Sequence, residues 1–540
     1  MSATEYLRHP AILLAAVSVA IALAWFALGF PVEMPRSPLA AGEKLDCLAY
    51  APARPGSTAA DATIPAANIE GDLARLAPQT SCIRTYTTGM GLDQVPPIAR
   101  RLGLTVLQGI AIGRDAERNR AEIERAIVLA RTDRAGIRAF VVGSEVLSRG
   151  DLAVTDLGVL VTRVREATKL PVTYADRWET WLDAGGLAAL VDFITIHVEL
   201  YRADDPVLAS AAARTMLDAR AKVAARFAAK QVTIGEIGWP SAGRMREAAL
   251  PSPANQARVI HDVVTAARSG SIRINIFEGY DQPWRVSREG TAGGHWGLID
   301  TETGANKFRW GREVSNHPLW FVQGVLGIML ALIAFAAGYL AARSMGPSGP
   351  AAAEWQPVAL VALAGGLFLG WAVADVPLRS HSILEWAHSI LLVGLAVAMP
   401  PVAAAALIRN VPFAGFGALL NPLQRSAARP LSQLVALLFV LTVLVAIQLA
   451  LGLVFDPANR DFLFAPLTGP AVALLVLAIR NSANARRDGP AEQAAALILA
   501  ASALFIAFNE TFWNWEALWF AATLLALALA CWRPRVARNP

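Results

Sequence analysis

Long uncharged apolar blocks are the feature of this sequence that most limits how the chain can fold. One block runs from Ala11 to Phe30, and several more follow His317 at short intervals. A helix of about 20 apolar residues is long enough to cross the hydrocarbon core of a bilayer. The blocks therefore predict about eight membrane-spanning helices, at residues 11–30, 318–342, 356–377, 383–408, 431–454, 462–479, 491–508 and 515–532.

Arginines near the ends of these blocks indicate how the helices are oriented. Cytoplasmic loops of membrane proteins carry an excess of Lys and Arg. If the N-terminus is cytoplasmic, the short loops on the opposite side hold Arg379 and Arg460, and ten arginines fall on the cytoplasmic side: Arg343, Arg409, Arg425, Arg429, Arg480, Arg486, Arg487, Arg533, Arg535 and Arg538. The stretch between the first two blocks is then predicted to face the periplasm or its equivalent. This pattern explains the net charge of +5 better than a basic stripe for nucleic acid.

That stretch, residues 43–314, has an ordinary globular composition and alternates β-rich runs with helical ones. Eight strand-then-helix units in about 270 residues are typical of a (β/α)8 TIM barrel, although a doubly wound sheet would show the same alternation. The predicted strands are 45–50, 82–87, 105–112, 137–142, 172–174, 193–197, 232–234 and 272–277. The clearest predicted helices are 116–131, 156–167, 206–229 and 255–268.

The chain is accordingly predicted to have three parts. Residues 1–42 form an N-terminal membrane anchor and linker, 43–314 the α/β barrel, and 315–540 an all-α transmembrane domain of about seven helices. The first block is longer than the 7–15-residue apolar core of a cleavable signal, so we expect an uncleaved anchor. The alternative is cleavage after Leu39-Ala40-Ala41, which imitates a cleavage site.

Two glutamates follow apolar runs in similar settings. Glu236 lies in Thr233-Ile-Gly-Glu-Ile-Gly-Trp-Pro-Ser241, and Glu145 ends Ile137-Arg-Ala-Phe-Val-Val-Gly-Ser-Glu. In a parallel barrel the carboxyl ends of the strands face one cleft, so the two acids are predicted to meet there. Such a pair suits cleavage of a glycosidic bond with retention, Glu236 acting as the nucleophile and Glu145 as the acid/base. Solvated loop carboxylates are the alternative for either glutamate alone.

The two motifs resemble those of glycoside hydrolase family 17, the β-1,3-glucanase family. Gly235-Glu-Ile-Gly-Trp-Pro240 resembles its G-E-x-G-W-P nucleophile motif, and Val142-Gly-Ser-Glu145 resembles its V-G-N-E acid/base motif. The segments 276–285 and 294–298 are similar to the family's strand-eight region. The resemblance covers roughly residues 43–310 and implies a retaining (β/α)8 enzyme that needs neither a metal nor another cofactor.

The sequence also departs from the family pattern. Ser144 stands where the family has an asparagine that bonds the sugar 2-hydroxyl, and Gln282 and Arg285 stand where plant members resemble glutamate and lysine. The anchor before the barrel and the spans behind it are similar to bacterial inner-membrane proteins identified as β-(1,6)-glucan synthases of rhizobial cyclic glucan assembly.

Further residues at or just past the predicted strand ends are candidates for binding the substrate. Tyr86 or His197 could orient the nucleophile by a hydrogen bond. Tryptophans could stack on sugar faces, and the motif makes Trp239 the first candidate among them. A structural role is the alternative for each residue. The candidates are Ser144, Tyr50, Arg84, Tyr86, Tyr174, Asp176, His197, Tyr201 and Glu278, with Trp178, Trp181, Trp239, Trp284 and Trp296.

Three cysteines show no metal spacing. Cys47 and Cys82 start the first two predicted strands, so an oxidising compartment would permit a bridge. Free cysteine is commonly buried, however, and two unbonded, buried side chains are the expectation we prefer. Polar residues in or beside the spans are expected to serve anchoring and helix packing rather than a substrate pathway: Glu385, His388, Gln433, Gln448 and Glu510.

Taken together, these features predict a membrane-anchored β-glucan glucanosyltransferase that acts by double displacement on periplasmic β-1,3- or β-1,6-glucan, cyclic glucan included. The expected partners are the glucan, the lipid bilayer and a membrane glucan synthase. The alternatives are an endo-β-1,3-glucanase and a non-catalytic glucan-binding or export component. No phosphate loop or nucleotide-sugar motif is apparent, so direct use of an activated sugar donor is not expected.

Overall fold

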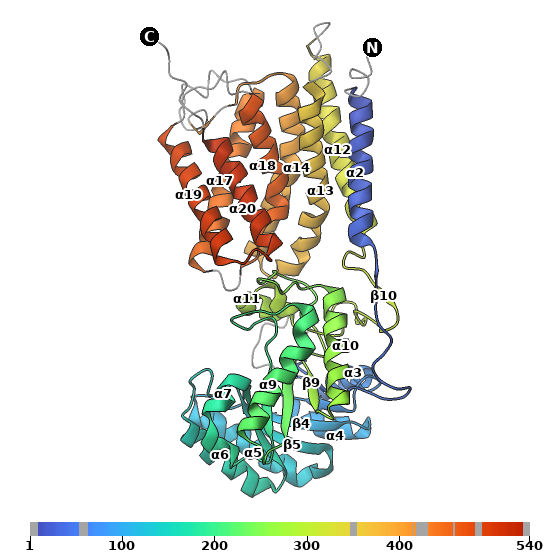
Figure 1. The fold of residues 1–540 in the computed structure, drawn as a ribbon, viewed down its shortest axis with the longest axis vertical. Helices are drawn as coiled ribbons and strands as arrows, with labels where there is room; N and C mark the ends of the chain where they lie inside the picture. The colour runs from blue at the N-terminus through green and yellow to red at the C-terminus, as the bar shows by residue number, and fades with distance from the viewer. Residues whose placement is uncertain are drawn as a thin grey trace. The chain divides into compact units, whose positions relative to one another are not determined.

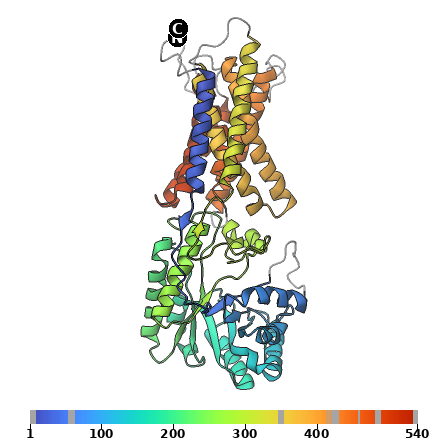
Figure 2. The same ribbon diagram turned by 90° about the vertical axis from the view of Figure 1, so that its right-hand side faces the viewer.

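The computed structural model describes residues 9–52, 63–345, 354–413, 415–416, 419, 430–456, 460–480 and 489–532. The chain forms two compact units. One comprises residues 32–288 and 292–314, and the other comprises residues 1–31, 289–291 and 315–540. Figures 1 and 2 show the strands in the first unit and the long helices in the second.

Eight parallel strands close into a barrel in the order β2 to β9, which confirms the predicted fold class. Each strand lies on one of the eight predicted runs. A short antiparallel pair, β1 (Val32–Glu33) with β10 (Glu313–Val314), joins the two ends of this unit. The barrel strands are β2 (Cys47–Ala49), β3 (Cys82–Arg84), β4 (Thr105–Ile110), β5 (Ile137–Ser144), β6 (Val172–Arg177), β7 (Ile194–His197), β8 (Val232–Ile237) and β9 (Ile274–Ile276).

Helices connect the strands, and local sequence signals mark where several of them start. The Asp115 side chain accepts hydrogen bonds from the amides of Glu117 and Arg118 at the start of α5, and Ser252 caps α10 ahead of a proline. The predicted helix 206–229 is shorter in the structure because its alanine-rich start offers no capping side chain. The main helices are α3 (Ala66–Leu76), α4 (Val95–Arg101), α5 (Ala116–Thr132), α6 (Val154–Thr168), α7 (Trp178–Asp183), α8 (Gly185–Ala188), α9 (Ala212–Arg226) and α10 (Pro253–Ser269).

Cys47 and Cys82 form a disulfide, so the expectation of two unbonded cysteines is wrong. Strands β2 and β3 are parallel neighbours in which Leu48 lies opposite Ile83. The residues just before this pair therefore also lie side by side, with Cα atoms 4.3 Å apart. Burial of both side chains is as predicted, but the strand register brings the two sulfurs within bonding distance.

The second unit is helical, and its helices match the eight predicted spans to within two residues. Among the described residues, six helices are long and apolar enough to cross a membrane by length and composition, while α18 and α20 have 17 residues each. The helices are α2 (Pro10–Gly29), α12 (Trp320–Arg343), α13 (Trp355–Arg379), α14 (Ile383–Ile408), α17 (Pro430–Phe455), α18 (Phe464–Arg480), α19 (Pro490–Asn509) and α20 (Trp515–Cys531).

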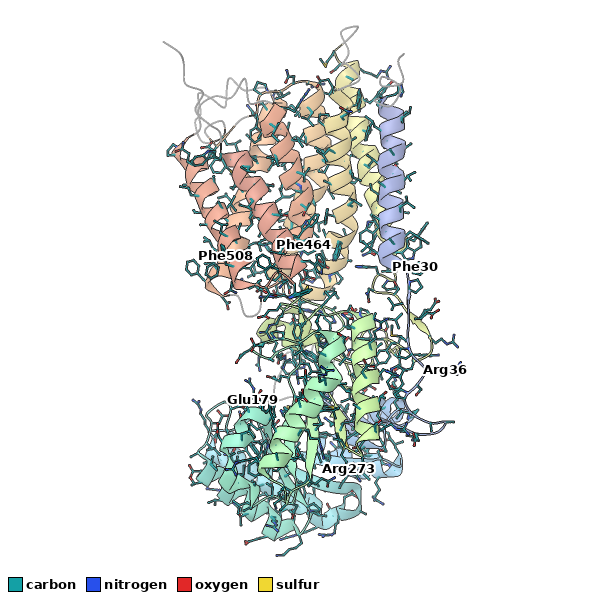
Figure 3. All side chains as sticks on the ribbon, in the orientation of Figure 1. Phe30, Arg36, Glu179, Arg273, Phe464 and Phe508 are labelled. Carbon is teal, nitrogen blue, oxygen red and sulfur yellow. A yellow bond between two sulfur atoms is a disulfide. The ribbon has the colours of Figure 1, made fainter. Side chains whose placement is uncertain are left out.

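Small residues let these helices approach closely. A Cβ atom added to Gly327 of α12 would lie 2.1 Å from the carbonyl oxygen of Gly366 in α13, so any larger side chain would push the two helices apart. Phe464 is buried inside the unit, whereas Phe508 is 84% exposed (Figure 3). Glu385 completes a capping box with Ser382 at the start of α14, which is a structural role.

Candidate active site

The carboxyl ends of β5 and β8 bring Glu145 and Glu236 close to one side chain, His197, at the end of β7. The His197 Nδ1 atom lies 2.8 Å from Glu145 Oε1, and its Nε2 atom lies 3.5 Å from Glu236 Oε1. One oxygen of each carboxylate and a nitrogen of His197 all lie within 4.8 Å of one another. The two carboxylates are 25% and 19% exposed, so a ligand can reach them.

Backbone geometry at the two strand ends sets this arrangement. Gly143 and Glu145 both have positive φ angles, of 85° and 58°. Non-glycine residues rarely adopt such angles, and those that do cluster at functional sites. On β8, a Cβ atom at Gly235 would meet the Thr195 side chain at 2.4 Å. Glycine at this position therefore allows β8 to lie close to β7, which carries His197.

Arg84, at the end of β3, is buried beneath these groups and contacts most of them. Its Nη1 donates to the Gly235 carbonyl at 2.6 Å and pairs with Glu236 Oε1 at 3.2 Å. Its Nη2 lies 3.3 Å from Ser144 Oγ and 3.2 Å from His197 Nε2. A guanidinium can only donate, so Nε2 accepts and the Nδ1–H group of His197 donates to Glu145.

The electrostatic surroundings give Glu145 an unusual acidity. Burial alone would raise its pKa. The hydrogen bond from His197 and the positive charges of Arg177 and Arg149 outweigh that effect and lower the pKa to about 2. Because the pKa of Glu145 is lower in the folded protein, its carboxylate stabilises the fold at pH values above the ordinary pKa of a glutamate. This stabilisation is lost as the pH falls through about 2.

Glu199 is a further carboxylate of the site, and it is absent from the residues selected in the sequence. It lies two residues after His197, pairs with Arg177 at 3.4 Å, and shares a small hollow with Glu236 and Trp296. Burial raises its pKa; Arg177 opposes this, and the negative charges of Glu145 and Glu236 raise it further. Its position just past a predicted strand end is the sequence feature by which it could have been selected.

Tyr86 and Ser144 lie beside the central residues. The Arg84 guanidinium stacks on the Tyr86 ring at 4.9 Å. The Tyr86 hydroxyl is buried and has no hydrogen-bond partner among the described residues. Burial and the charge of Glu236 hold the pKa of Tyr86 above its ordinary value, so the hydroxyl keeps its proton. The predicted hydrogen bond from Tyr86 to the nucleophile therefore stays a prediction.

Three of the predicted aromatic residues have internal partners. Tyr50 donates to Asp72 Oδ2 at 2.9 Å, and the Tyr201 hydroxyl donates to the Arg244 carbonyl at 2.6 Å. Trp239 is fully buried, and its indole N–H donates to the Leu250 carbonyl at 3.0 Å. The structure thus places Trp239 in the barrel core, where neither ring face is open to a sugar, because the turn after β8 directs it inward.

The remaining predicted residues lie in two groups, around Tyr174 and around Glu278, and among the tryptophans. Tyr174 bonds to Asp176, and its ring packs on the buried Trp181. Glu278, fully buried, pairs with Arg285 at 2.8 Å and accepts from Gln282 at 3.3 Å. Trp284, whose indole N–H donates to Gln282 Oε1, is 44% exposed and is therefore open to a ligand. Trp178 is partly exposed as well. Trp296 packs on Tyr201 and on the Arg202 guanidinium.

Glu145, His197 and Glu236 also have the donor atoms of a metal site. The charge of Arg84 opposes this use, because its guanidinium already contacts Glu236 and His197. A cation at the same position would meet a buried positive charge within a few ångströms. The chemistry of this donor set therefore favours two free carboxylates over metal ligation.

Comparisons with known proteins bear on the barrel. Residues 47–297 match the family model of the BtgE/BtgC glycoside hydrolase domain. Over these residues the barrel is therefore similar to a glycoside hydrolase domain. It is similar to a glucan 1,3-beta-glucosidase of Candida albicans, with 25% identity over 262 residues that cover 43% of this chain and 83% of that protein. A glucan 1,3-beta-glucosidase of Saccharomyces cerevisiae is 23% identical over 253 residues, 43% of this chain and 80% of its own.

Among solved structures, the barrel is similar to a glycoside hydrolase family 17 beta-1,3-glucanosyltransferase from Rhizomucor miehei. The identity is 24% and the TM-score 0.44, and the match covers 48% of this chain and 95% of that one.

Proposed function

We propose that this protein is a membrane-anchored, retaining β-glucan glucanosyltransferase. The observation that carries the proposal is the placement of Glu145 and Glu236 at two strand ends, both against His197 and with carboxylate oxygens within 4.8 Å. Retaining glycosidases need two carboxyl groups about 5–5.5 Å apart. The substrate class, β-glucan, rests on the similarity of the barrel to glucan 1,3-beta-glucosidases.

In the first step Glu236 attacks the anomeric carbon, and Glu145 gives a proton to the departing sugar oxygen. The pKa of about 2 makes this protonated form of Glu145 a minor population of the free protein at neutral pH. Arg84 supports this step because it pairs with Glu236 Oε1 at 3.2 Å and so holds the attacking carboxylate in place. In the second step the Glu145 carboxylate takes a proton from the acceptor hydroxyl, which attacks the glycosyl-enzyme and releases Glu236. The hydrogen bond from His197 favours the carboxylate form of Glu145, which is the form that this second step requires.

Replacing His197 with alanine should move the alkaline limb of the kcat/KM profile to higher pH, by about one pH unit or more. The Nδ1–H donor that lowers the pKa of Glu145 is then lost, while burial, which raises it, remains. More Glu145 therefore carries the proton that the first step consumes. His197→Asn, which retains a neutral donor, should shift the limb less. An unchanged limb in a folded His197→Ala protein would refute this role of His197.

We further propose that the barrel lies in the periplasm of a bacterium and the helical unit in its inner membrane, beside a glucan synthase. The ten-to-two distribution of arginines supports this orientation. The disulfide between Cys47 and Cys82 also supports it, because disulfides persist in oxidising compartments. A permanent place in the membrane suits an enzyme that transfers glucan chains where they are exported, and it suits a role in rhizobial-type cyclic glucan assembly.

The deciding experiment incubates the purified full-length protein in detergent with linear β-1,3-gluco-oligosaccharides and analyses the products by mass spectrometry and linkage NMR. Products longer than the substrate, or products with new β-1,6 linkages, are expected. Shorter products alone would make the protein an endo-β-1,3-glucanase, since water can replace the sugar acceptor on the same glycosyl-enzyme. No turnover at all would point to a glucan-binding role.

A further inference from the structure

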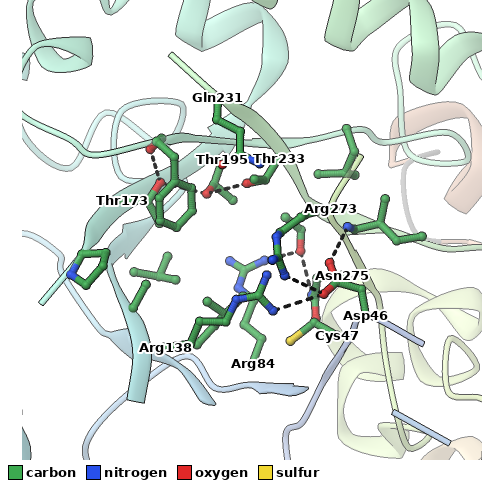
Figure 4. Close-up of a pocket in the computed structure, with 18 residues that line it drawn as sticks. Asp46, Cys47, Arg84, Arg138, Thr173, Thr195, Gln231, Thr233, Arg273 and Asn275 are labelled. Carbon is green, nitrogen blue, oxygen red and sulfur yellow. Dashed lines mark hydrogen bonds and ion pairs between the residues drawn. The ribbon is translucent and has the colours of Figure 1, made fainter. Parts of the chain in front are cut away.

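The interior of the barrel holds a cavity of about 220 Å³ on the N-terminal side of Arg84. TIM barrels usually fill this space with bulky branched side chains. Here β6, β7 and β8 contribute Thr173, Thr195 and Thr233, whose hydroxyls lie in a row 2.8 and 3.2 Å apart. These short polar side chains leave the space open, and Figure 4 shows the residues that surround it.

Positive charge dominates the wall of this chamber. Among the described residues that line it, the charged ones are Arg84, Arg138, Arg273 and Asp46, which sum to +2. Arg138 and Arg273 share a single carboxylate oxygen, Asp46 Oδ1, at 3.1 and 3.3 Å. One carboxylate therefore serves two guanidinium groups, and their remaining N–H donors lie at the chamber wall beside Arg84 (Figure 4).

Two buried polar atoms, on side chains that line the chamber, have no hydrogen-bond partner in the described part of the chain. They are Arg84 Nε, a donor, and Asn275 Oδ1, an acceptor, and both side chains are 1% exposed. Arg84 Nη1 and Asn275 Nδ2 both donate to the Gly235 carbonyl, at 2.6 and 2.7 Å, so the two unpartnered atoms belong to neighbouring groups. Buried polar groups are normally satisfied, which implies an occupant that can both accept and donate.

We propose that this chamber binds a small oxyanion that carries a hydroxyl group, of which hydrogen phosphate is the simplest. Guanidinium groups match phosphate oxygens with paired N–H donors. Its oxygens accept from the arginines, including Arg84 Nε, and its hydroxyl donates to Asn275 Oδ1. The chamber exceeds the volume of about seven water molecules at roughly 30 Å³ each, so a phosphate group and a few waters fit together.

This site is distinct from the sugar-processing site. Neither Glu145 nor Glu236 lines the chamber, and Arg84 is the charged side chain that reaches both places. Binding there is therefore measurable without turnover, and its failure would leave the proposed function untouched. The Glu236→Gln variant should bind phosphate at least as tightly as the wild type, because it removes a negative charge that Arg84 now contacts.

The test is isothermal titration of the full-length protein in detergent with inorganic phosphate at neutral pH. One site per chain is expected. The Arg138→Gln/Arg273→Gln double variant should bind at least tenfold more weakly, and Asp46→Asn, which removes the competing charge, should bind more tightly. Arg114→Gln is the matched control, since Arg114 pairs with Asp151 and does not line the chamber. Melting curves verify that each variant is folded.

Two further ligands identify the chemistry. Sulfate, which carries no hydroxyl at neutral pH, should bind more weakly than phosphate. Tighter binding of glycerol phosphate than of inorganic phosphate would assign the chamber to a phosphate ester, and equal or weaker binding would assign it to free phosphate. Absence of phosphate binding in both the wild type and Asp46→Asn would overturn the proposal. So would undiminished binding in the folded double variant.

Discussion

Replacing Glu236 with glutamine should lower the rate of glucan processing on the order of 10⁴-fold or more, because a neutral amide cannot form the glycosyl-enzyme. The substitution keeps the size and shape of the side chain. Glutamine can also still accept the hydrogen bond from Arg84 that Glu236 receives as an ion pair. Folding and detergent extraction should therefore be close to those of the wild type. The rate is measured as loss of linear β-1,3-gluco-oligosaccharide per mole of folded protein.

Glu199→Gln is the matched control for this experiment. Glu199 lies in the same hollow as Glu236 and is also partly buried, but no step of the proposed mechanism uses it. Its replacement should change the rate less than tenfold. Glu145→Gln should cost 10² to 10⁴-fold, the usual contribution of a general acid/base. Normal processing by a folded Glu236→Gln protein would remove the enzymatic assignment of the site.

Replacing Arg84 with methionine should lower both activity and stability. The substitution leaves the buried part of Glu236 without its cationic partner. It also removes the donor to His197 Nε2 and one of the two donors to the Gly235 carbonyl. Breaking a buried ion pair on one side costs about 3–5 kcal/mol. We expect a lower melting temperature of the barrel and a fall in kcat of at least 10²-fold, measured by calorimetry and by initial rates.

Arg84→Lys separates charge from geometry. A lysine restores the positive charge near Glu236, but an ammonium group cannot contact Gly235, Ser144 and His197 through a planar fork. Compared with Arg84→Met, Arg84→Lys should therefore have a higher melting temperature but nearly the same low kcat. Full recovery of kcat in Arg84→Lys would show that Arg84 acts by charge alone. A folded Arg84→Met protein with wild-type kcat would contradict a supporting role of Arg84 at Glu236.

The barrel could be predicted from the sequence because its strands are short apolar runs separated by amphipathic helices. Each run has to be buried on both faces, so its position is fixed by composition. The position of Glu145 and Glu236 at the same end of the barrel could be predicted for the same reason, since each follows such a run. The start of α9 could not be located because alanines around residue 211 give no capping signal.

The contacts inside the site depend on three-dimensional packing that no local pattern encodes. Arg84 crosses the barrel interior from β3 to a carbonyl that lies 151 residues later in the chain. The position of Arg84 at a predicted strand end therefore indicates only that it could line the cleft. It does not indicate which groups the side chain contacts. Trp239 shows the converse, because the motif fixes its position in the sequence but not the direction of its ring. The Cys47–Cys82 bridge likewise follows from strand register rather than from spacing.

The helical unit was predictable in length and position, since uncharged blocks of this size have few alternatives. The sequence could not predict which of these helices pack against each other. The approach of Gly327 to Gly366 depends on which faces of α12 and α13 meet, and both helices are apolar all round.

Trapping the glycosyl-enzyme would show whether the reaction passes through a covalent bond to Glu236. The full-length protein is incubated with a 2-fluoro-substituted β-glucosyl donor that carries a good leaving group, digested, and analysed by peptide mass spectrometry. One fluoroglucosyl group per chain is expected, attached to the peptide at Glu236 and absent from Glu236→Gln. A label on another residue, or steady turnover of the natural glucan with no label on any residue, would contradict a double displacement through Glu236.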